Sequence, residues 1–199
     1  MSRLILAATA AGLLLGLLGR GHPVAAWAGV SETWALTALL FSAGVVMGAD
    51  LERVARLLSR GWRLLLTPLG AALGSLLGGL LAAPLAGMRP VHALAVAGGF
   101  GWYSLDAVLV GRMAGPELAV IAFVANLIRE LTGLAAAAWL MRRLGRPAAV
   151  AAAGATAMDT GLGVLVRAGG AEAGVEGFVS GLLLSAAVPL LLGFLGRWL

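Results

Sequence analysis

Gly98-Gly99-Phe100-Gly101-Trp102-Tyr103-Ser104-Leu105-Asp106 interrupts an otherwise apolar sequence. Its glycines weaken a helix by about 1 kcal/mol each relative to alanine, and two amphipathic aromatic residues, a hydroxyl and a carboxylate follow directly. Backbone without helical geometry is tolerated at membrane depth only where it is buried in protein or lines a wet cavity. We therefore expect this stretch to form a site rather than part of a plain membrane helix.

The composition around this stretch is that of an integral membrane protein. The 199 residues are 61% hydrophobic and 12% charged, with a mean hydropathy of +1.00, whereas a soluble domain carries about 25% charged residues. The net charge of +5 comes from arginines in short loops, where they act as orientation signals and not as a nucleic-acid surface. Without cysteine there is no thiol chemistry or disulfide. Because His22 and His92 are isolated, we expect no metal site and no cofactor.

The apolar residues gather into seven segments, which predict an all-α membrane protein of about six to seven hydrophobic segments, two of them broken or re-entrant at glycines. The segments are Leu4–Leu18, Thr33–Ala49, Leu64–Gly87, Val91–Val110, Leu118–Met141, Ala148–Val166 and Phe178–Leu195. We expect one transport domain over residues 1–199, with its core at 64–199 and possible scaffold helices at 4–49. A small acidic loop is expected at 167–177, and a break or kink near Pro189.

Two segments carry glycines at four-residue spacing. The first segment has Gly12 and Gly16, and we interpret it as a short transmembrane helix and not as a cleaved signal peptide. In the third segment, Gly70, Gly74 and Gly78 place a thin stripe on one helical face. Such a stripe predicts close packing against another segment or a second protomer.

The positions of the arginines predict how the segments cross the membrane. Loops 50–63 and 142–147 are both rich in arginine, which predicts that both are cytoplasmic. If every segment between them crossed once, the two loops would lie on opposite sides. One segment therefore does not cross simply, and the glycine-rich Val91–Val110 is the candidate. We favour a re-entrant hairpin there, with an unusual broken crossing as the alternative.

Four ionisable residues lie inside apolar segments, namely Asp106, Arg129, Glu130 and Asp159. Each costs about 2.5–3.5 kcal/mol at a helix centre, so a functional role is the default interpretation. Glu130 shares a helical face with Asn126, while Arg129 points about 100° away. Arg129 and Glu130 are poorly placed to neutralise each other, so each needs a partner elsewhere, Asp106 or Asp159. The alternative is a buried Arg129–Asp159 ion pair that serves only packing.

A second glycine-bounded interruption, Gly154–Gly161, matches the first. Paired broken segments are typical of secondary transporters, in which helix N-termini attract anionic groups and free carbonyls attract cations. The predicted backbone-binding positions are Gly98, Gly99, Gly101 and Gly154. Trp102 and Tyr103 are candidates for a cation–π face, with an interfacial aromatic belt as the alternative.

Four blocks together resemble the LysO-type lysine exporter family. They are Gly98-Gly99-Phe100-Gly101-Trp102-Tyr103-Ser104-Leu105, Leu127-Ile128-Arg129-Glu130-Leu131, Gly154-Ala155-Thr156-Ala157-Met158-Asp159 and Arg167-Ala168-Gly169-Gly170. The resemblance extends from about the second apolar segment to the C-terminus. It implies a bacterial inner-membrane exporter of L-lysine driven by proton exchange, with Glu130 and Asp159 at the transport centre. It also implies broken helices that cross, as in the distantly similar cation/proton antiporters and bile-acid symporters.

The chain departs from the resembled pattern in length and at three positions. Family members have additional N-terminal segments, so the chain resembles their C-terminal part, and we expect a homodimer or a partner membrane subunit. Asn126 stands where the family usually has aspartate, and Asp106 where it usually has serine. Ala157 replaces a hydroxyl residue.

The predicted function is export of L-lysine or a related cationic amino acid. Glu130 and Asp159 would bind either protons or the cationic groups of the substrate, with Ser104, Thr156 and Asn126 as neutral hydrogen-bonding groups. A membrane potential holds a monovalent cation inside by about 2.3 kcal/mol per 100 mV, so uphill export needs coupling.

Other interpretations are a membrane subunit of a two-component transporter, a homodimeric cation/proton antiporter for another substrate, or a cation channel. An intramembrane enzyme with Ser104 as nucleophile is disfavoured because no histidine lies in a convincing partner position.

Overall fold

The computed structural model describes residues 61–199 without a gap. Before them it describes only single residues, at 11, 12, 14, 15, 34, 38, 41, 45, 52, 55 and 59. Most of the predicted segments Leu4–Leu18 and Thr33–Ala49, including Gly16, and most of loop 50–63 therefore lie outside the described residues.

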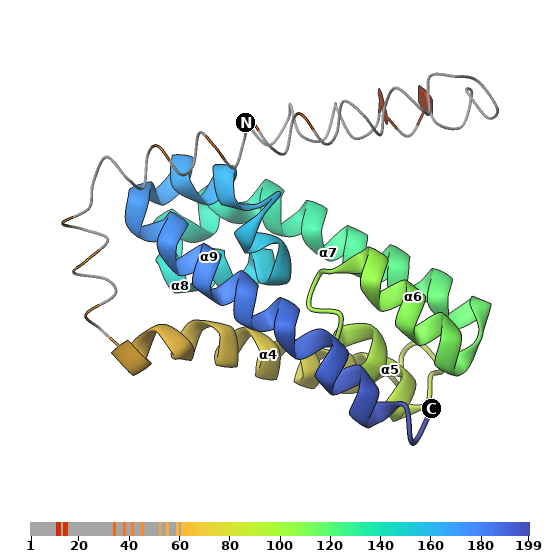
Figure 1. Ribbon diagram of the computed structural model, residues 1–199. Helices are drawn as coiled ribbons and strands as arrows, with labels where there is room; N and C mark the ends of the chain where they lie inside the picture. The colour runs from red at the N-terminus through yellow and green to blue at the C-terminus, as the bar shows by residue number, and fades with distance from the viewer. Residues whose placement is uncertain are drawn as a thin grey trace.

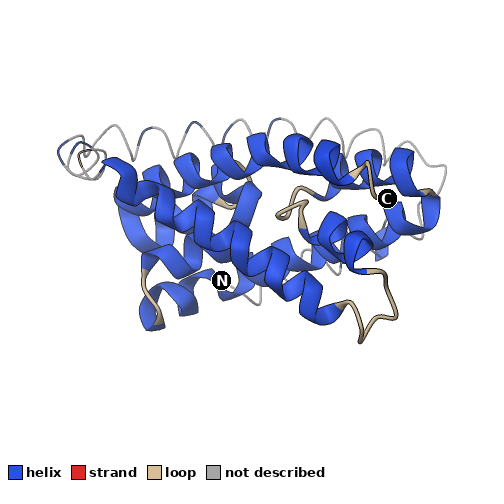
Figure 2. Ribbon diagram, turned by 90° about the horizontal axis from the view of Figure 1, so that it is seen from below, coloured by secondary structure: helices blue, strands red, loops and turns tan. Residues whose placement is uncertain are grey.

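The continuous part is built from helices alone (Figures 1 and 2), which confirms the all-α prediction for residues 61–199. In chain order these are the 3-10 turn η1 (Gly61–Leu65), α4 (Leu66–Ala82), α5 (Pro90–Ala97), α6 (Tyr103–Ala114), α7 (Pro116–Arg143), α8 (Arg146–Ala153), the 3-10 turn η2 (Gly154–Met158) and α9 (Leu162–Leu195).

Three of the described helical stretches are long and apolar enough to cross a membrane: Gly61–Ala82, Pro116–Arg143 and Leu162–Leu195. The shortest has 22 residues, and a helix needs about 20 residues to span the hydrocarbon core. Large apolar side chains cover the outside of these helices. On α4, Leu69, Leu73 and Leu77 are each more than half exposed. A face of this kind suits lipid and not water.

The remaining helices are too short to cross. With 8 and 12 residues, α5 and α6 extend about 12 and 18 Å, less than the hydrocarbon core of about 30 Å. They lie together at the end of the molecule where the C-terminus lies, while α8 and the first turns of α9 lie at the opposite end (Figure 1).

The predicted loop at 167–177 is wrong, because these residues belong to α9. The helix instead breaks at Gly170, whose φ of +72° is open to glycine but strained for other residues. No such break occurs at Pro189, where the dihedral angles stay helical. Residues 162–169 are therefore a short helix that turns at Gly170 into the long crossing part of α9.

Each interruption has its own buried apolar cluster. Around α5 and α6, Phe100, Val110 and Leu192 lie in one cluster with side chains from α7 and α9. Around α8 and η2, Val150 and Leu165 lie in another. These clusters fix each short helix against a long one.

The two interruptions meet through the backbone. Ala155 N donates to Phe100 O over 2.9 Å. Phe100 and Gly101 have positive φ, at 49° and 100°, and so has Gly154, at 67°. A Cβ on Gly154 would overlap Phe100 O, so glycine is needed for this close approach. The two predicted glycine interruptions therefore form one junction.

Arg63 and Arg146, which belong to the two arginine-rich loops, lie at the same end of the molecule, because both line one cavity of about 280 Å³. Between them the chain runs through the long helices α4 and α7 and the short pair α5 and α6. This path agrees with the prediction that both arginine-rich loops lie on the same side of the membrane. How the short pair sits in a membrane stays a prediction.

Candidate functional site

Two carboxylates meet at a hydroxyl beside the junction. Glu130, on α7, is only 6% exposed. Thr160 Oγ1 donates a hydrogen bond to Glu130 Oε1 over 2.5 Å and lies 3.4 Å from Asp159 Oδ1. The same Asp159 oxygen accepts from Thr160 N over 2.6 Å. The hydroxyl of Thr160 thus lies between the two carboxylates that the family resemblance implies for the transport centre.

The turn between η2 and α9 positions this group. After η2 the chain leaves helical geometry at Asp159 (φ −129°, ψ −97°), and helical angles return at Gly161 (φ −75°, ψ −23°). Gly161 N donates to Thr156 O over 2.7 Å, and a Cβ on Gly161 would lie 2.8 Å from that oxygen. Because Gly161 has no Cβ, the turn can close tightly, and it places Thr160 opposite Glu130 of α7.

Sequence reasoning missed Thr160. It placed Thr156 in the site instead, but Thr156 is buried and its hydroxyl donates to Ala153 O over 2.9 Å. The sequence carries no signal for Thr160, because its contact with Glu130 joins residues 30 positions apart.

Asn126 ties the first interruption to α7. Its amide nitrogen lies 2.7 Å from Asp106 Oδ2, 2.9 Å from Val96 O and 3.0 Å from Ala122 O, and these three acceptors share its two N–H groups. Its carbonyl oxygen accepts from Gly101 N over 2.8 Å. These bonds use both ends of the amide. Asn126 therefore holds α5, the turn and α6 in place on α7.

Asp106 is completely buried, at 0% exposed, in the first turn of α6. It reaches this position because Gly99 lacks a side chain, and a Cβ there would lie 2.5 Å from Asp106 Oδ2. Its other oxygen, Oδ1, has no hydrogen-bond partner. No arginine in the described part of the chain forms an ion pair with it. The N-terminal end of a helix favours a negative group, which fits this carboxyl.

Arg129 lies at the junction without an acidic partner. Its Nη2 donates to Ala151 O over 3.3 Å, and its buried Nη1 has no hydrogen-bond partner. Within residues 61–199 the ion pairs are those of Arg146, and Arg129 and Asp159, the alternative pair, form none. A Cβ on Gly101 would lie 3.2 Å from Nη1. The guanidinium instead lies near the C-terminal end of α8, where helix carbonyls favour a cation.

The other predicted side chains have different contacts. Tyr103 stacks edge-on against Phe123, with ring centroids 5.1 Å apart. Trp102 is half-buried against the apolar cluster of α5 and α6, and Ser104 is exposed. Gly98 allows close packing, since a Cβ there would lie 2.9 Å from Leu191 Cδ2.

A cavity of about 440 Å³ lies between α4, α5 and α7. Small residues form most of its wall, among them Gly74 and Gly78 of the α4 stripe. Asn126 and Arg129 supply polar groups to it. The cavity therefore reaches the two α7 residues that face the junction.

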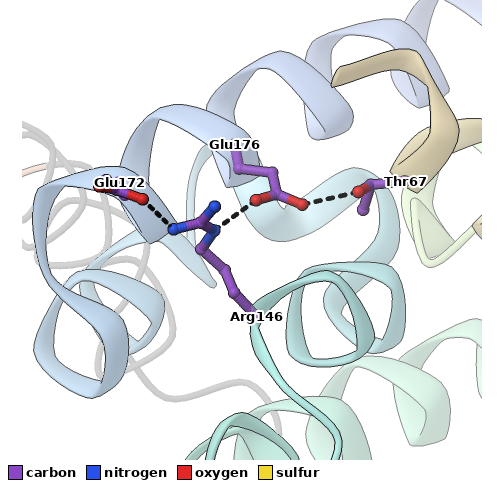
Figure 3. Close-up of polar contacts among 4 residues, drawn as sticks. All are labelled: Thr67, Arg146, Glu172 and Glu176. Atoms are coloured by element: carbon purple, nitrogen blue, oxygen red, sulfur yellow. Dashed lines mark hydrogen bonds and ion pairs between the residues drawn. The ribbon is translucent and has the colours of Figure 1, made fainter. Parts of the chain in front are cut away.

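A second polar cluster lies at the arginine-rich end (Figure 3). Arg146, at the start of α8, forms ion pairs with Glu172 and Glu176 of α9, the latter over 2.5 Å. Glu176 Oε1 also accepts from Thr67 Oγ1 of α4 over 2.6 Å. One arginine and one glutamate thus connect α4, α8 and α9, a connection that the sequence did not predict.

Within the residues that the structure describes, no three His, Cys, Asp or Glu side chains come together in a way that could hold a metal ion. The polar groups at the junction are carboxyl groups, a hydroxyl, a guanidinium and backbone groups.

Comparison with known proteins gives a consistent result. The family model described as "Lysine exporter LysO" matches residues 6–195. The lysine exporter LysO of Escherichia coli K12 is 36% identical over 167 residues, which cover 82% of this chain and 54% of that protein. A putative lysine exporter of Haemophilus influenzae is 36% identical over 122 residues, which cover 61% of this chain and 62% of that protein. The chain thus spans a little over half the length of the curated relatives it matches. No solved structure shows significant similarity to it.

Proposed function

The chain belongs to the LysO family of lysine exporters, and from this membership we propose that it exports L-lysine or a related cationic amino acid in exchange for protons. We place it in the cytoplasmic membrane of a bacterium, with the arginine-rich end that holds Arg63 and Arg146 on the cytoplasmic side.

The observation that carries the proposal is the meeting of Glu130 and Asp159 at Thr160. Two carboxyl groups next to non-helical backbone, in an apolar helical protein, need a compensating charge. Protons supply it in one state and a cationic substrate supplies it in the other. Binding of one excludes the other, and this exclusion is what couples the two fluxes.

The positive charge of the substrate sets the electrical cost of export. A membrane potential that is negative inside opposes exit of a cation by about 2.3 kcal/mol per 100 mV. Entry of a proton for each lysine that leaves moves no net charge. The exchange therefore removes the electrical barrier that would stop passive export.

The arrangement of the short helices determines from which side of the membrane the site can be reached. The pair α5 and α6 forms one re-entrant hairpin, and α8 with residues 162–169 forms another from the opposite side. Their turns meet at the contact of Phe100 O with Ala155 N. Non-helical backbone is tolerated at this depth because each turn is buried in protein. Movement of α4, α7 and α9 around this junction would expose the carboxylates to one side at a time.

The test is transport by the purified full chain in proteoliposomes. Wild type should show counterflow of labelled lysine, with arginine and ornithine as competitors, and uphill lysine movement driven by a proton gradient. Glu130→Gln and Asp159→Asn should abolish the uphill movement. Glu117→Gln, which alters an exposed carboxylate in the first turn of the same helix α7, should not. Full uphill transport by Asp159→Asn would refute the proposal.

A second candidate is a membrane subunit that completes a two-component transporter or forms a homodimeric antiporter. The stripe of α4 favours it, since a Cβ added at Gly70, Gly74 or Gly78 meets no atom of the described residues within 4 Å. Such a face allows a further helix to approach closely. Counterflow by the purified chain as a monomer would exclude this candidate, whereas transport that appears only with a second copy or a partner would establish it.

A further inference from the structure

Thr160 contacts both carboxylates of the proposed transport centre. Its Oγ1 lies 2.5 Å from Glu130 Oε1 and 3.4 Å from Asp159 Oδ1. A threonine hydroxyl has one proton to donate and two lone pairs that accept. It can therefore donate to one carboxylate and accept from the other when that other group is protonated.

We propose that Thr160 joins Glu130 and Asp159 into one proton-sharing pair and that its hydroxyl passes the proton between them. This inference rests on the proposed proton exchange and deepens it. Two interacting carboxyl groups of this kind release their protons as a pair and not as separate residues.

The proton transfer balances at every atom. The bond from Asp159 Oδ1 to its proton breaks as that proton bonds to Thr160 Oγ1. The original hydroxyl proton of Thr160 leaves at the same time and bonds to Glu130 Oε1. Asp159 ends as a carboxylate, Glu130 as a neutral acid and Thr160 unchanged. The reverse transfer uses the same bonds, and no oxidant or other reactant takes part.

One contact has to change for this transfer. The separation of 3.4 Å between Thr160 Oγ1 and Asp159 Oδ1 exceeds the usual range of about 2.5–3.0 Å for a hydrogen bond between two oxygens. Asp159 is only partly buried, which leaves its carboxyl group able to rotate toward the hydroxyl. In the structure Thr160 therefore donates to Glu130, and rotation of Asp159 completes the path.

The charged residues described around Glu130 and Asp159 form no ion pair with either carboxylate. From α7, Glu130 faces Thr160, whereas its neighbour Arg129 donates to Ala151 O at the junction. From its own turn, Asp159 faces Thr160. Within residues 61–199 no arginine forms an ion pair with either carboxylate. A proton or a cationic substrate is thus what neutralises the pair.

The pair also suits a cationic ligand. A primary ammonium group, such as the side chain of lysine or ornithine, has three donors on one nitrogen, so it can donate to Glu130 and Asp159 together in place of the shared proton.

The first test does not depend on transport. Infrared difference spectra of the purified full chain, acid minus neutral, report the band of the protonated carboxyl groups. Thr160→Val should move this band to higher frequency, because the carboxyl group loses its hydroxyl partner. Thr160→Ser should restore the wild-type band. The control Thr132→Val removes a hydroxyl that bonds only Ile128 O and Arg129 O of its own helix, and should change nothing. Identical spectra for Thr160→Val and wild type would overturn the inference.

The second test separates proton coupling from substrate binding. In proteoliposomes, lysine–lysine counterflow needs no net proton movement, whereas uphill transport does. Thr160→Val should lower proton-driven transport about ten- to a hundredfold, the change expected from losing a hydrogen bond to a charged group, and lower counterflow by a smaller factor, whereas the control Thr132→Val should leave both activities unchanged. Thr160→Ser should restore proton-driven transport. Equal loss of both activities, without rescue by serine, would show a purely structural role.

The two tests also separate this inference from the proposed function. Wild type without any lysine counterflow would refute the function, while the infrared result would still decide whether the carboxylates share a proton through Thr160.

Discussion

Asn126 Nδ2 lies 2.7 Å from Asp106 Oδ2, across the contact between α7 and the first turn of α6. The sequence shows an amide and an acid at two separate positions, and the structure makes them one hydrogen-bonded pair. Asp106 is the completely buried member of this pair. Its carboxyl group lies in the first interruption, apart from the pair of Glu130 and Asp159.

This pair predicts a stability effect. Asn126→Ala removes a donor to Asp106 and the acceptor for Gly101 N. We expect the free energy of unfolding to fall by about 1–3 kcal/mol, the cost of unsatisfied buried polar groups. Thermal unfolding of the protein in detergent measures it. Asn126→Asp should also destabilise, because two acids then face each other, and Asp106→Asn in the same chain should recover part of the loss. Additive losses in that double variant would contradict the pairing.

We expect a second stability effect at Gly154, where the two interruptions contact each other. Gly154→Ala introduces a Cβ that overlaps Phe100 O, at a backbone position with φ of +67°. Strain at such a position costs about 1–3 kcal/mol before the overlap is counted, so the unfolding temperature should drop clearly. Gly70→Ala is the matched control, since its Cβ meets nothing within 4 Å in a regular helix. That variant should be neutral or slightly stabilising.

In the polar cluster at the arginine-rich end, we expect Glu176 to contribute more to the free energy of unfolding than Glu172. The Glu176 side chain is 5% exposed and that of Glu172 is 27% exposed, and both pair with Arg146. Glu176→Gln should destabilise by about 1.5–3 kcal/mol, as expected for a buried hydrogen-bonded charge. Glu172→Gln should cost less than about 1 kcal/mol, as expected for a more exposed ion pair. Chemical unfolding of the two variants side by side measures the difference, and an equal or reversed order would contradict it.

The path of α5 and α6 predicts which residues lie on which side of the membrane. The chain contains no cysteine, so single cysteines label without background. Arg89→Cys and Arg112→Cys flank the short pair at exposed positions. Both should react in intact cells with a maleimide that does not cross membranes, whereas Arg63→Cys and Arg142→Cys should not. A simple crossing would instead put positions 89 and 112 on opposite sides.

Much of the candidate site was readable from residue types alone. Asp106, Arg129, Glu130 and Asp159 stand out because a charge in an apolar segment is costly, wherever the fold places it. Thr160 does not stand out, because a threonine in an apolar helix satisfies its hydroxyl on its own backbone. Its role follows from lying opposite Glu130, a residue 30 positions away.

The sequence by itself determined the membrane class and the helical fold of residues 61–199, and it predicted the two glycine interruptions. Each of these follows from local properties: apolar length, the need to satisfy backbone groups in lipid, and the conformational freedom of glycine. The break at Gly170 was missed because a small acidic stretch resembles a loop until its neighbours are known.

Tertiary structure alone decided the partners. The interruptions meet at Phe100 and Ala155, Arg129 faces backbone carbonyls and not an acid, and Asp106 pairs with Asn126. Glycine spacing and charge say which positions need partners. Which partner each one finds depends on how the helices pack, because hydrogen bonds and ion pairs form only where packing brings the atoms within about 3 Å of each other.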